Sequence, residues 1–101
     1  MMRIAYLVNR HPDRVPVRVE RRDDRIPDIS NKKFLVPREM TVGQFMLHLR
    51  KRLDINKSQG VFVFVNNVLP PNMSLMGQLY EEHKDHELML NIVYALENIF
   101  G

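Results

Sequence analysis

The fold is decided by residues 41–65, which read TVGQFMLHLRKRLDINKSQGVFVFV. The first part predicts an amphipathic helix, because its apolar side chains recur at intervals of three and four residues. Thr41 and Gln44 match a capping box, in which the threonine hydroxyl accepts from the third helical amide and the glutamine side chain reaches back. The last part, residues 61–65, is a continuous β-prone run that predicts a central strand covered on both faces. The apolar face of the helix contains Val42, Phe45, Met46, Leu49 and Leu53.

Three shorter strand patterns flank this stretch. The first has the period-two alternation of a half-buried strand, with Val15, Val17 and Val19 separated by Pro16 and Arg18. Proline there is compatible with a strand only near an edge or an irregularity, where its missing N–H is not needed. Residues 33–37 predict a second short strand, which ends at a proline, and residues 88–94 predict the last strand.

Two short helices and a turn complete the predicted order. Residues 1–10 predict a short N-terminal helical segment that ends before Pro12. Residues 74–80 predict a short helix weakened by Gly77, and Asn66 and Asn67 predict a turn. The order β-β-α-β-α-β in one domain of residues 1–101 predicts an α+β fold of the β-grasp type. We expect a four-stranded mixed sheet, one long crossing helix and a C-terminal tail, residues 96–101, that is flexible.

Composition excludes several classes of protein. The chain has 101 residues, of which 45% are hydrophobic, so it can build one modest core and is not disordered. It has no cysteine, which excludes disulfides, thiolate metal sites and a thiol nucleophile. No apolar run is long enough to span a bilayer, and we expect no signal peptide because the N-terminal residues lack its apolar h-region.

Charge is distributed unevenly between the two halves of the chain. Residues 1–52 contain 13 Lys/Arg and 6 Asp/Glu, a net charge of +7, whereas residues 53–101 contain 2 and 6, a net charge of −4. A basic N-terminal half favours an acidic partner such as an acidic peptide, nucleic acid or an anionic lipid surface.

No constellation of residues supports an enzyme. His83 and His86 lack an identifiable third metal ligand, so we expect no metal site and no cofactor. Adjacent carboxylates at Glu81 and Glu82 point apart on a helix, which disfavours shared acid–base chemistry. We therefore expect a binding protein.

The strand at residues 33–37 is the strongest candidate for a binding surface. A short strand that ends at a proline is a natural sheet edge, whose unpaired N–H and C=O groups can pair with an extended peptide. Neighbouring side chains of a strand point to opposite faces, so Phe34, Leu35 and Val36 cannot all be buried in one core. Some apolar surface at this edge therefore needs a cover or a partner.

The chain ends at Gly101. A terminal glycine carboxylate has no Cβ beside it and can enter a narrow enzyme groove in conformations that other residues cannot adopt. Such a terminus suits a protein whose own carboxylate is activated and joined to an amine.

Eight short motifs follow one another along the chain: PDRVPV (residues 12–17), KFLVP (33–37), TVGQF (41–45), RKR (50–52), FVFVNN (62–67), LPP (69–71), YEEHKD (80–85) and ENIFG (97–101). In these motifs and their spacing the chain closely resembles the ubiquitin-like autophagy modifiers of the GABARAP and microtubule-associated light-chain-three family, from about Ile4 to Gly101, with a shortened N-terminal helical arm. The resemblance implies the ubiquitin-like β-grasp fold.

The resemblance implies conjugation to a membrane lipid. Family members are activated and carried by a ubiquitin-like enzyme cascade and joined through their terminal glycine to phosphatidylethanolamine, and a cysteine protease processes and delipidates them. Gly101 would be that glycine. The implied protein is a non-enzymatic, monomeric modifier that is cytoplasmic, and on autophagosome membranes when lipidated, with no nucleic-acid partner.

The resemblance also implies a docking site for cargo receptors that carry an aromatic-x-x-aliphatic motif. An aromatic pocket would be lined by Leu7, Pro16, Leu35 and Met89, with Lys33 at its rim. An aliphatic pocket would be lined by Phe34, Val36, Pro37, Met40, Phe45 and Leu49. Arg14, Lys32 and Arg52 would meet acidic residues that flank the motif. His48, where leucine is usual in the family, is expected to make the aliphatic pocket slightly pH-dependent.

Two alternatives remain open. The chain could be a β-grasp module that binds peptides without being conjugated. It could instead bind a polyanion through basic side chains, although no aromatic platform for bases is interleaved with them. The basic side chains for that alternative are Arg21, Arg22, Arg25, Arg50 and Arg52.

Overall fold

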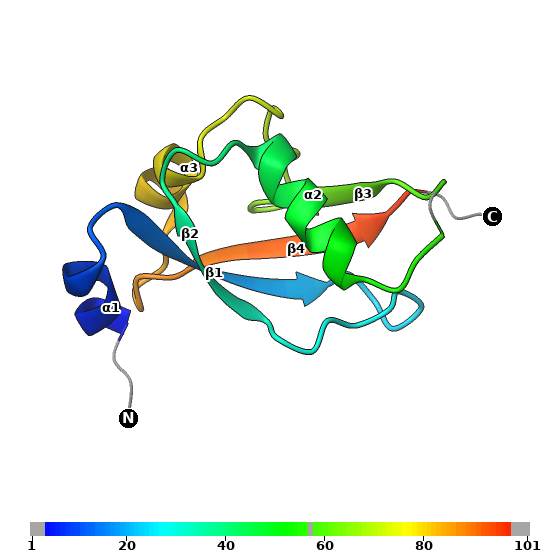
Figure 1. Cartoon of the computed structure of the whole chain (residues 1–101), viewed down its shortest axis with the longest axis horizontal. Coiled ribbons are helices and arrows are strands. Elements are labelled where there is room, and N and C mark those ends of the chain that lie inside the picture. Colours follow the sequence, from blue (N-terminus) through cyan, green and yellow to red (C-terminus); the bar gives the residue numbers. More distant parts are fainter. Residues whose placement is uncertain (1–3, 57, 98–101) are drawn as a thin grey trace.

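The computed structural model describes residues 4–56 and 58–97, in which helices and strands alternate around one sheet (Figure 1). The strand order is β2-β1-β4-β3, with β1 and β4 parallel and the two outer pairs antiparallel. This arrangement confirms the predicted β-grasp fold with a four-stranded mixed sheet. The elements are α1 (Ile4–Arg10), β1 (Arg14–Arg21), β2 (Lys33–Pro37), α2 (Val42–Arg52), β3 (Val61–Phe64), α3 (Met76–His83) and β4 (Leu90–Leu96).

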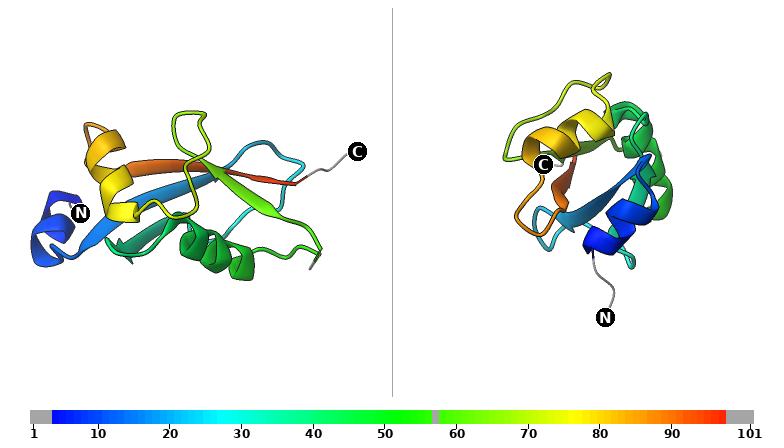
Figure 2. Two further views of the ribbon diagram at one scale, coloured as in Figure 1. Left: turned by 90° about the horizontal axis from the view of Figure 1, so that it is seen from above. Right: turned by 90° about the vertical axis from the view of Figure 1, so that its left-hand side faces the viewer.

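The helices lie at different places around the sheet. Figure 1 shows α2 crossing the strands, while α1 and α3 lie at the end where β1 and β4 begin. The views in Figure 2 show that β4 ends at the opposite end of the molecule from α1. Leu96 closes β4 and the Glu97 amide donates to the Gly60 carbonyl over 2.8 Å, so the first two residues of the predicted tail belong to the folded domain.

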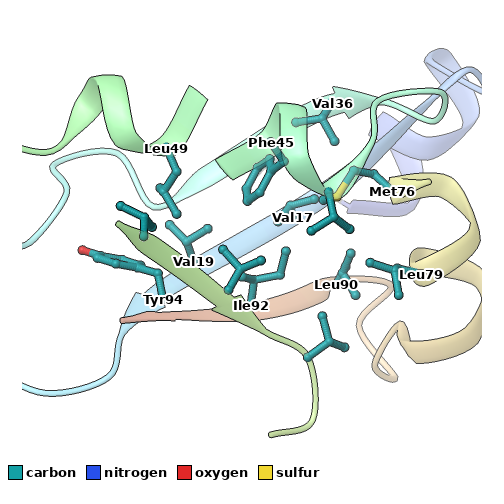
Figure 3. Close-up of a cluster of buried hydrophobic side chains, with 14 of the residues drawn as sticks. Val17, Val19, Val36, Phe45, Leu49, Met76, Leu79, Leu90, Ile92 and Tyr94 are labelled. Atoms are coloured by element: carbon teal, nitrogen blue, oxygen red, sulfur yellow. The ribbon is translucent and has the colours of Figure 1, made fainter. Parts of the chain in front are cut away.

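The core forms between the sheet and α2 (Figure 3). Val17 and Val19 of β1 are fully buried, as the period-two pattern predicts, and Phe45 and Leu49 of α2 lie over them. The predicted capping box is present. The Gln44 amide donates to Thr41 Oγ1 over 3.1 Å, and the Thr41 amide donates to Gln44 Oε1 over 2.9 Å.

Pro16 lies in an inner strand, where proline is rare. In the antiparallel pair with β2, alternate residues bond across the ladder, and the Val19 amide bonds to the Lys32 carbonyl. An amide at position 16 would therefore face away from β2, toward β4. Because the pairing with β4 begins only at Val17, no bond is lost at Pro16. The irregularity that the sequence predicted is this late start of the parallel pair.

The prediction that β3 is a central strand covered on both faces is wrong. The strand is at the edge of the sheet, and Phe62 remains 40% exposed on the face away from the core. Phe64 shares that face by strand periodicity, and the Arg22 guanidinium lies 4.2 Å from its ring centroid. A continuous apolar run in the sequence of a strand does not reveal which face of that strand a helix will cover.

Helix α3 begins and ends later than the sequence predicted. It spans Met76–His83 rather than residues 74–80, and it includes Gly77. This glycine is buried against the segment after β2, and its amide donates to the Arg38 carbonyl over 3.0 Å. The absence of a side chain therefore allows close approach between α3 and Arg38.

Gly77→Ala should destabilise the fold, although alanine is the better helix former by about 1 kcal/mol. A Cβ at this position would lie 2.7 Å from the Arg38 Cβ and 3.1 Å from its Cα, so backbone must move. We expect a net loss of about 1–3 kcal/mol, measured by urea denaturation. Gly43→Ala is the matched control, since its Cβ would meet Asn72 at an ordinary 3.5 Å. Equal stability of the two variants would contradict the close approach.

Candidate functional site

The open edge of β2 is the centre of the candidate site. Strand β2 is the outer neighbour of β1, as the sequence predicted, and its other side has no strand in the described part of the chain. Leu35 stands opposite Pro16 in a pair that does not bond across the ladder. Its N–H and C=O therefore point outward, where the Arg14 guanidinium approaches the Leu35 oxygen at 3.4 Å. An extended peptide could pair with these groups.

A pocket of about 220 Å³ lies beside this edge, between β2 and α2. Every residue predicted for the aliphatic pocket lines it. His48 also lines it, together with Arg14, Leu35 and Arg52 at its entrance. The set shared by the prediction and the structure is Phe34, Val36, Pro37, Met40, Phe45 and Leu49.

The pocket has a rigid aromatic wall. The Phe34 and Phe45 rings meet edge to face, with centroids 6.2 Å apart, and the Arg52 guanidinium lies 5.2 Å from the centroid of Phe34. Phe45 and Leu49 are buried and anchor the wall to the core. A branched aliphatic side chain would find apolar contacts inside and positive charge at the entrance.

The residues predicted for the aromatic pocket lie on the opposite face of the sheet. Leu35 and Pro16 are register partners and share that face, and period two along β4 places Met89 there as well. Leu7 comes from α1, which packs against β1. Pro16 and Met89 are buried, so Leu7 and Leu35, which are half-buried, are the members that a ligand can reach. Lys33 is exposed beside them.

Met89 is held in place by Asp85. Asp85 Oδ1 accepts from the amides of Met89 over 3.0 Å and Glu87 over 2.8 Å, and Oδ2 accepts from Asn91 Nδ2 over 2.7 Å. Desolvation raises the pKa of this carboxyl, but the hydrogen bonds outweigh it, and the pKa is lowered from its usual value.

Asp85→Ala should destabilise the domain by about 1–3 kcal/mol, because three donors lose their acceptor. A lowered pKa means that Asp85 stabilises the fold above its unfolded value of about 3.9, and that this contribution is lost as the pH falls through the folded value. The variant should therefore lose less stability than the parent between about pH 5 and pH 2. Urea denaturation across that range checks this, with Glu87→Ala as control. Parallel curves for parent and variant would contradict the role of Asp85.

The basic residues predicted to meet acidic flanks differ in their availability. Arg14 and Arg52 are exposed at the pocket entrance. Lys32 Nζ instead lies 3.3 Å from an Asp28 carboxylate oxygen and 3.6 Å from a Glu20 oxygen, and hydrogen bonding to Asp28 raises the pKa of Lys32. Lys32 would have to exchange these partners for a ligand.

Four of the five arginines of the polyanion alternative are engaged by their own chain, and the fifth, Arg52, is exposed with its guanidinium over the Phe34 ring. Arg25 makes a bidentate contact with Asp23, Arg21 donates to the Ile26 carbonyl, and Arg22 stacks on Phe64. Arg50 donates to the Gln59 carbonyl. These contacts disfavour a nucleic-acid surface.

Sequence reasoning missed one exposed apolar residue next to the pocket. Leu47 is 59% exposed on α2, off the apolar stripe of that helix. It lines a neighbouring hollow together with Pro37, Met40 and His48. The sequence did contain a signal for this residue, because a leucine outside the apolar stripe of a helix is expected to be exposed.

Some predicted features lie outside the described residues. Gly101, the predicted conjugation site, is one of them. Over residues 4–56 and 58–97, no group of three or more His, Cys, Asp or Glu side chains could hold a metal ion. Within the same residues, no helix has the length and apolarity that a membrane span requires.

Comparison with known proteins gives consistent similarities. The family model described as "Autophagy protein Atg8 ubiquitin like" matches residues 3–101. Autophagy-related protein 8d of Arabidopsis thaliana is 46% identical over 98 residues, which cover 96% of this chain and 82% of the relative. Autophagy-related protein 8a of the same plant is 48% identical over 93 residues, covering 91% and 76%. The crystal structure of Trypanosoma brucei ATG8 superposes with a TM-score of 0.88 at 36% identity, covering 97% of this chain and 85% of that one.

Proposed function

The chain belongs to the Atg8 family of ubiquitin-like autophagy proteins, and from this membership we propose that it is a modifier joined through Gly101 to phosphatidylethanolamine on autophagosomal membranes. In this proposal it also docks cargo receptors and autophagy factors at the edge of β2. The observation that supports docking most directly is the pocket beside that edge, which contains all six side chains expected for an aliphatic anchor.

The geometry of the edge suits an aromatic-x-x-aliphatic motif. Residues three apart in an extended peptide point to opposite faces, because the side-chain period of a strand is two. The two predicted subsites also lie on opposite faces of β2, one beside Leu35 and one beside Phe34 and Val36. A peptide paired with Leu35 could fill both subsites without a kink.

Acidic residues that flank the motif would meet basic side chains at both subsites. Arg14 and Arg52 are exposed at the entrance of the aliphatic pocket, Lys33 is exposed beside the aromatic one, and the N-terminal half of the chain carries a net charge of +7. Salt should weaken this electrostatic contribution and leave the apolar anchors intact. The pockets would then set affinity, and the basic rim would set the rate of encounter.

Lipid conjugation would hold the domain on a membrane. Two acyl chains give stable anchoring, which a single acyl chain does not. In this proposal the partners are the activating and conjugating enzymes, the processing and delipidating cysteine protease and the receptors. The protein would move between the cytoplasm and the autophagosome membrane.

Intact-mass analysis of the untagged chain from membrane and soluble fractions tests the proposal. The membrane fraction should contain the chain with the added mass of one phosphatidylethanolamine less one water, because an amide bond forms. A chain of unmodified mass in every fraction, with peptide binding retained, would favour the non-conjugated β-grasp module instead.

A further inference from the structure

A second hollow, of about 380 Å³, adjoins the aliphatic pocket and is lined by another side of α2, at Gln44, Leu47, His48 and Lys51. The two hollows share Pro37, Met40 and His48, so they are separated by a common wall rather than by a stretch of surface. Along the chain the second hollow lies toward the end of β2, because Phe34, Leu35 and Val36 line only the first hollow and Glu39 lines only the second. We call it the extension pocket.

The lining of the extension pocket favours an apolar occupant. Leu47 is 59% exposed there, and Met40 and Pro37 supply further apolar surface. Glu39 and Lys51 are charges of opposite sign at its border, so an ionic side chain would meet one attractive and one repulsive group. The two charges therefore favour neither a positive nor a negative side chain in the pocket. The apolar surface favours an apolar side chain.

We propose that the extension pocket takes a large apolar side chain of the docked peptide, two residues after its aliphatic anchor. This inference rests on the proposed docking of an aromatic-x-x-aliphatic segment at β2. With the aromatic residue beside Lys33 and Leu35 and the aliphatic one beside Val36 and Pro37, as the proposed docking has it, the motif runs in the direction of β2. Its next residues therefore continue toward residues 37–40.

The position in the peptide follows from strand geometry. Side chains two residues apart lie on the same face, about 6.6–6.8 Å from each other. The residue two after the aliphatic anchor thus returns to the α2 side, where the extension pocket adjoins the first. The residue one after the anchor points to the other face. The selected motif is aromatic-x-x-aliphatic-x-apolar.

Calorimetry with three synthetic peptides tests the inference. The first reads Asp-Glu-Trp-Ala-Ser-Leu-Ser-Phe-Gly, the second has serine in place of phenylalanine, and the third has the phenylalanine moved one residue earlier. The first should bind the parent protein about fivefold to tenfold more tightly than the other two, as expected for partial burial of one large apolar side chain.

Leu47→Ser should remove this preference and leave the affinity for the second peptide unchanged. Because Leu47 is exposed, the substitution does not open the core. Leu69→Ser is the matched control, since Leu69 is 54% exposed but lies in the segment after β3, and it should keep the preference. Equal binding of the three peptides by the parent, or a preference that survives Leu47→Ser, would overturn this inference alone. No binding of any peptide would overturn docking at β2 and the inference with it.

Discussion

Gly101→Ala should abolish transfer of the chain to phosphatidylethanolamine while leaving the fold intact. In the proposed reaction the terminal glycine enters a narrow enzyme groove that a Cβ would obstruct, and glycine reaches backbone conformations that alanine does not. The added methyl group would therefore stand beside the carboxylate that must be activated. The measurement is the amount of lipid-linked chain, by intact mass, after reaction with the family's activating and conjugating enzymes and vesicles that contain phosphatidylethanolamine.

Gly43→Ala is the matched glycine substitution for this experiment. Its Cβ would make only ordinary contacts, so it should be conjugated like the parent. Circular dichroism and thermal unfolding should be unchanged for Gly101→Ala. Undiminished lipid transfer of that variant would refute the assignment of the conjugation site.

The second large effect is expected from Phe34→Ala combined with Leu35→Ala. One side chain belongs to the aliphatic pocket and the other to the opposite face of β2, so both subsites lose an anchor. Hot-spot truncations cost about 2 kcal/mol or more each, and the sum of about 4 kcal/mol predicts weaker binding of receptor-motif peptides by roughly several hundredfold.

The fold should tolerate this pair of substitutions. Phe34 is only partly buried, although its edge-to-face contact with Phe45 is lost, and we expect a stability loss of roughly 2 kcal/mol. Leu35→Ala alone should weaken peptide binding without destabilising the fold, because Leu35 lies on the face of β2 that is turned away from the core. Phe62→Ala, an exposed aromatic on the opposite edge strand, is the control. Calorimetry with one acid-flanked peptide measures the affinity of each variant. If the double variant bound the peptide as tightly as the parent protein, the docking site would not be at β2.

The residues of the candidate site came from the family resemblance, while the local patterns gave only the edge strand and the helix. The strand at residues 33–37 and the helix that starts at Val42 are separated by one short turn, which is why the structure brings their facing side chains into one pocket. The extension pocket was not predictable in the same way. Leu47 departs from the helical stripe, but only the path of residues 37–40 beside α2 turns that departure into a hollow.

The engagement of Lys32 and the role of Gly77 were also beyond the sequence. Lys32 is held by Asp28, four residues away, and by Glu20 on β1, which a charge count does not reveal. Gly77 was expected to weaken its helix, yet the helix packs at that glycine against Arg38, 39 positions earlier in the chain. Contacts between residues distant in sequence set both outcomes.

The sequence by itself determined the elements whose causes are local. Period-two valines made β1, and a threonine and a glutamine three residues apart capped α2, because these interactions form within one strand or one helical turn. Tertiary structure alone decided which strands lie at the edges of the sheet and which face of each remains open. It made β3 an outer strand despite its unbroken apolar run, and it allowed Pro16 an inner place because β4 joins one residue later. The physical reason is that strand neighbours and helix cover are set by pairing across the whole chain, which no local pattern encodes.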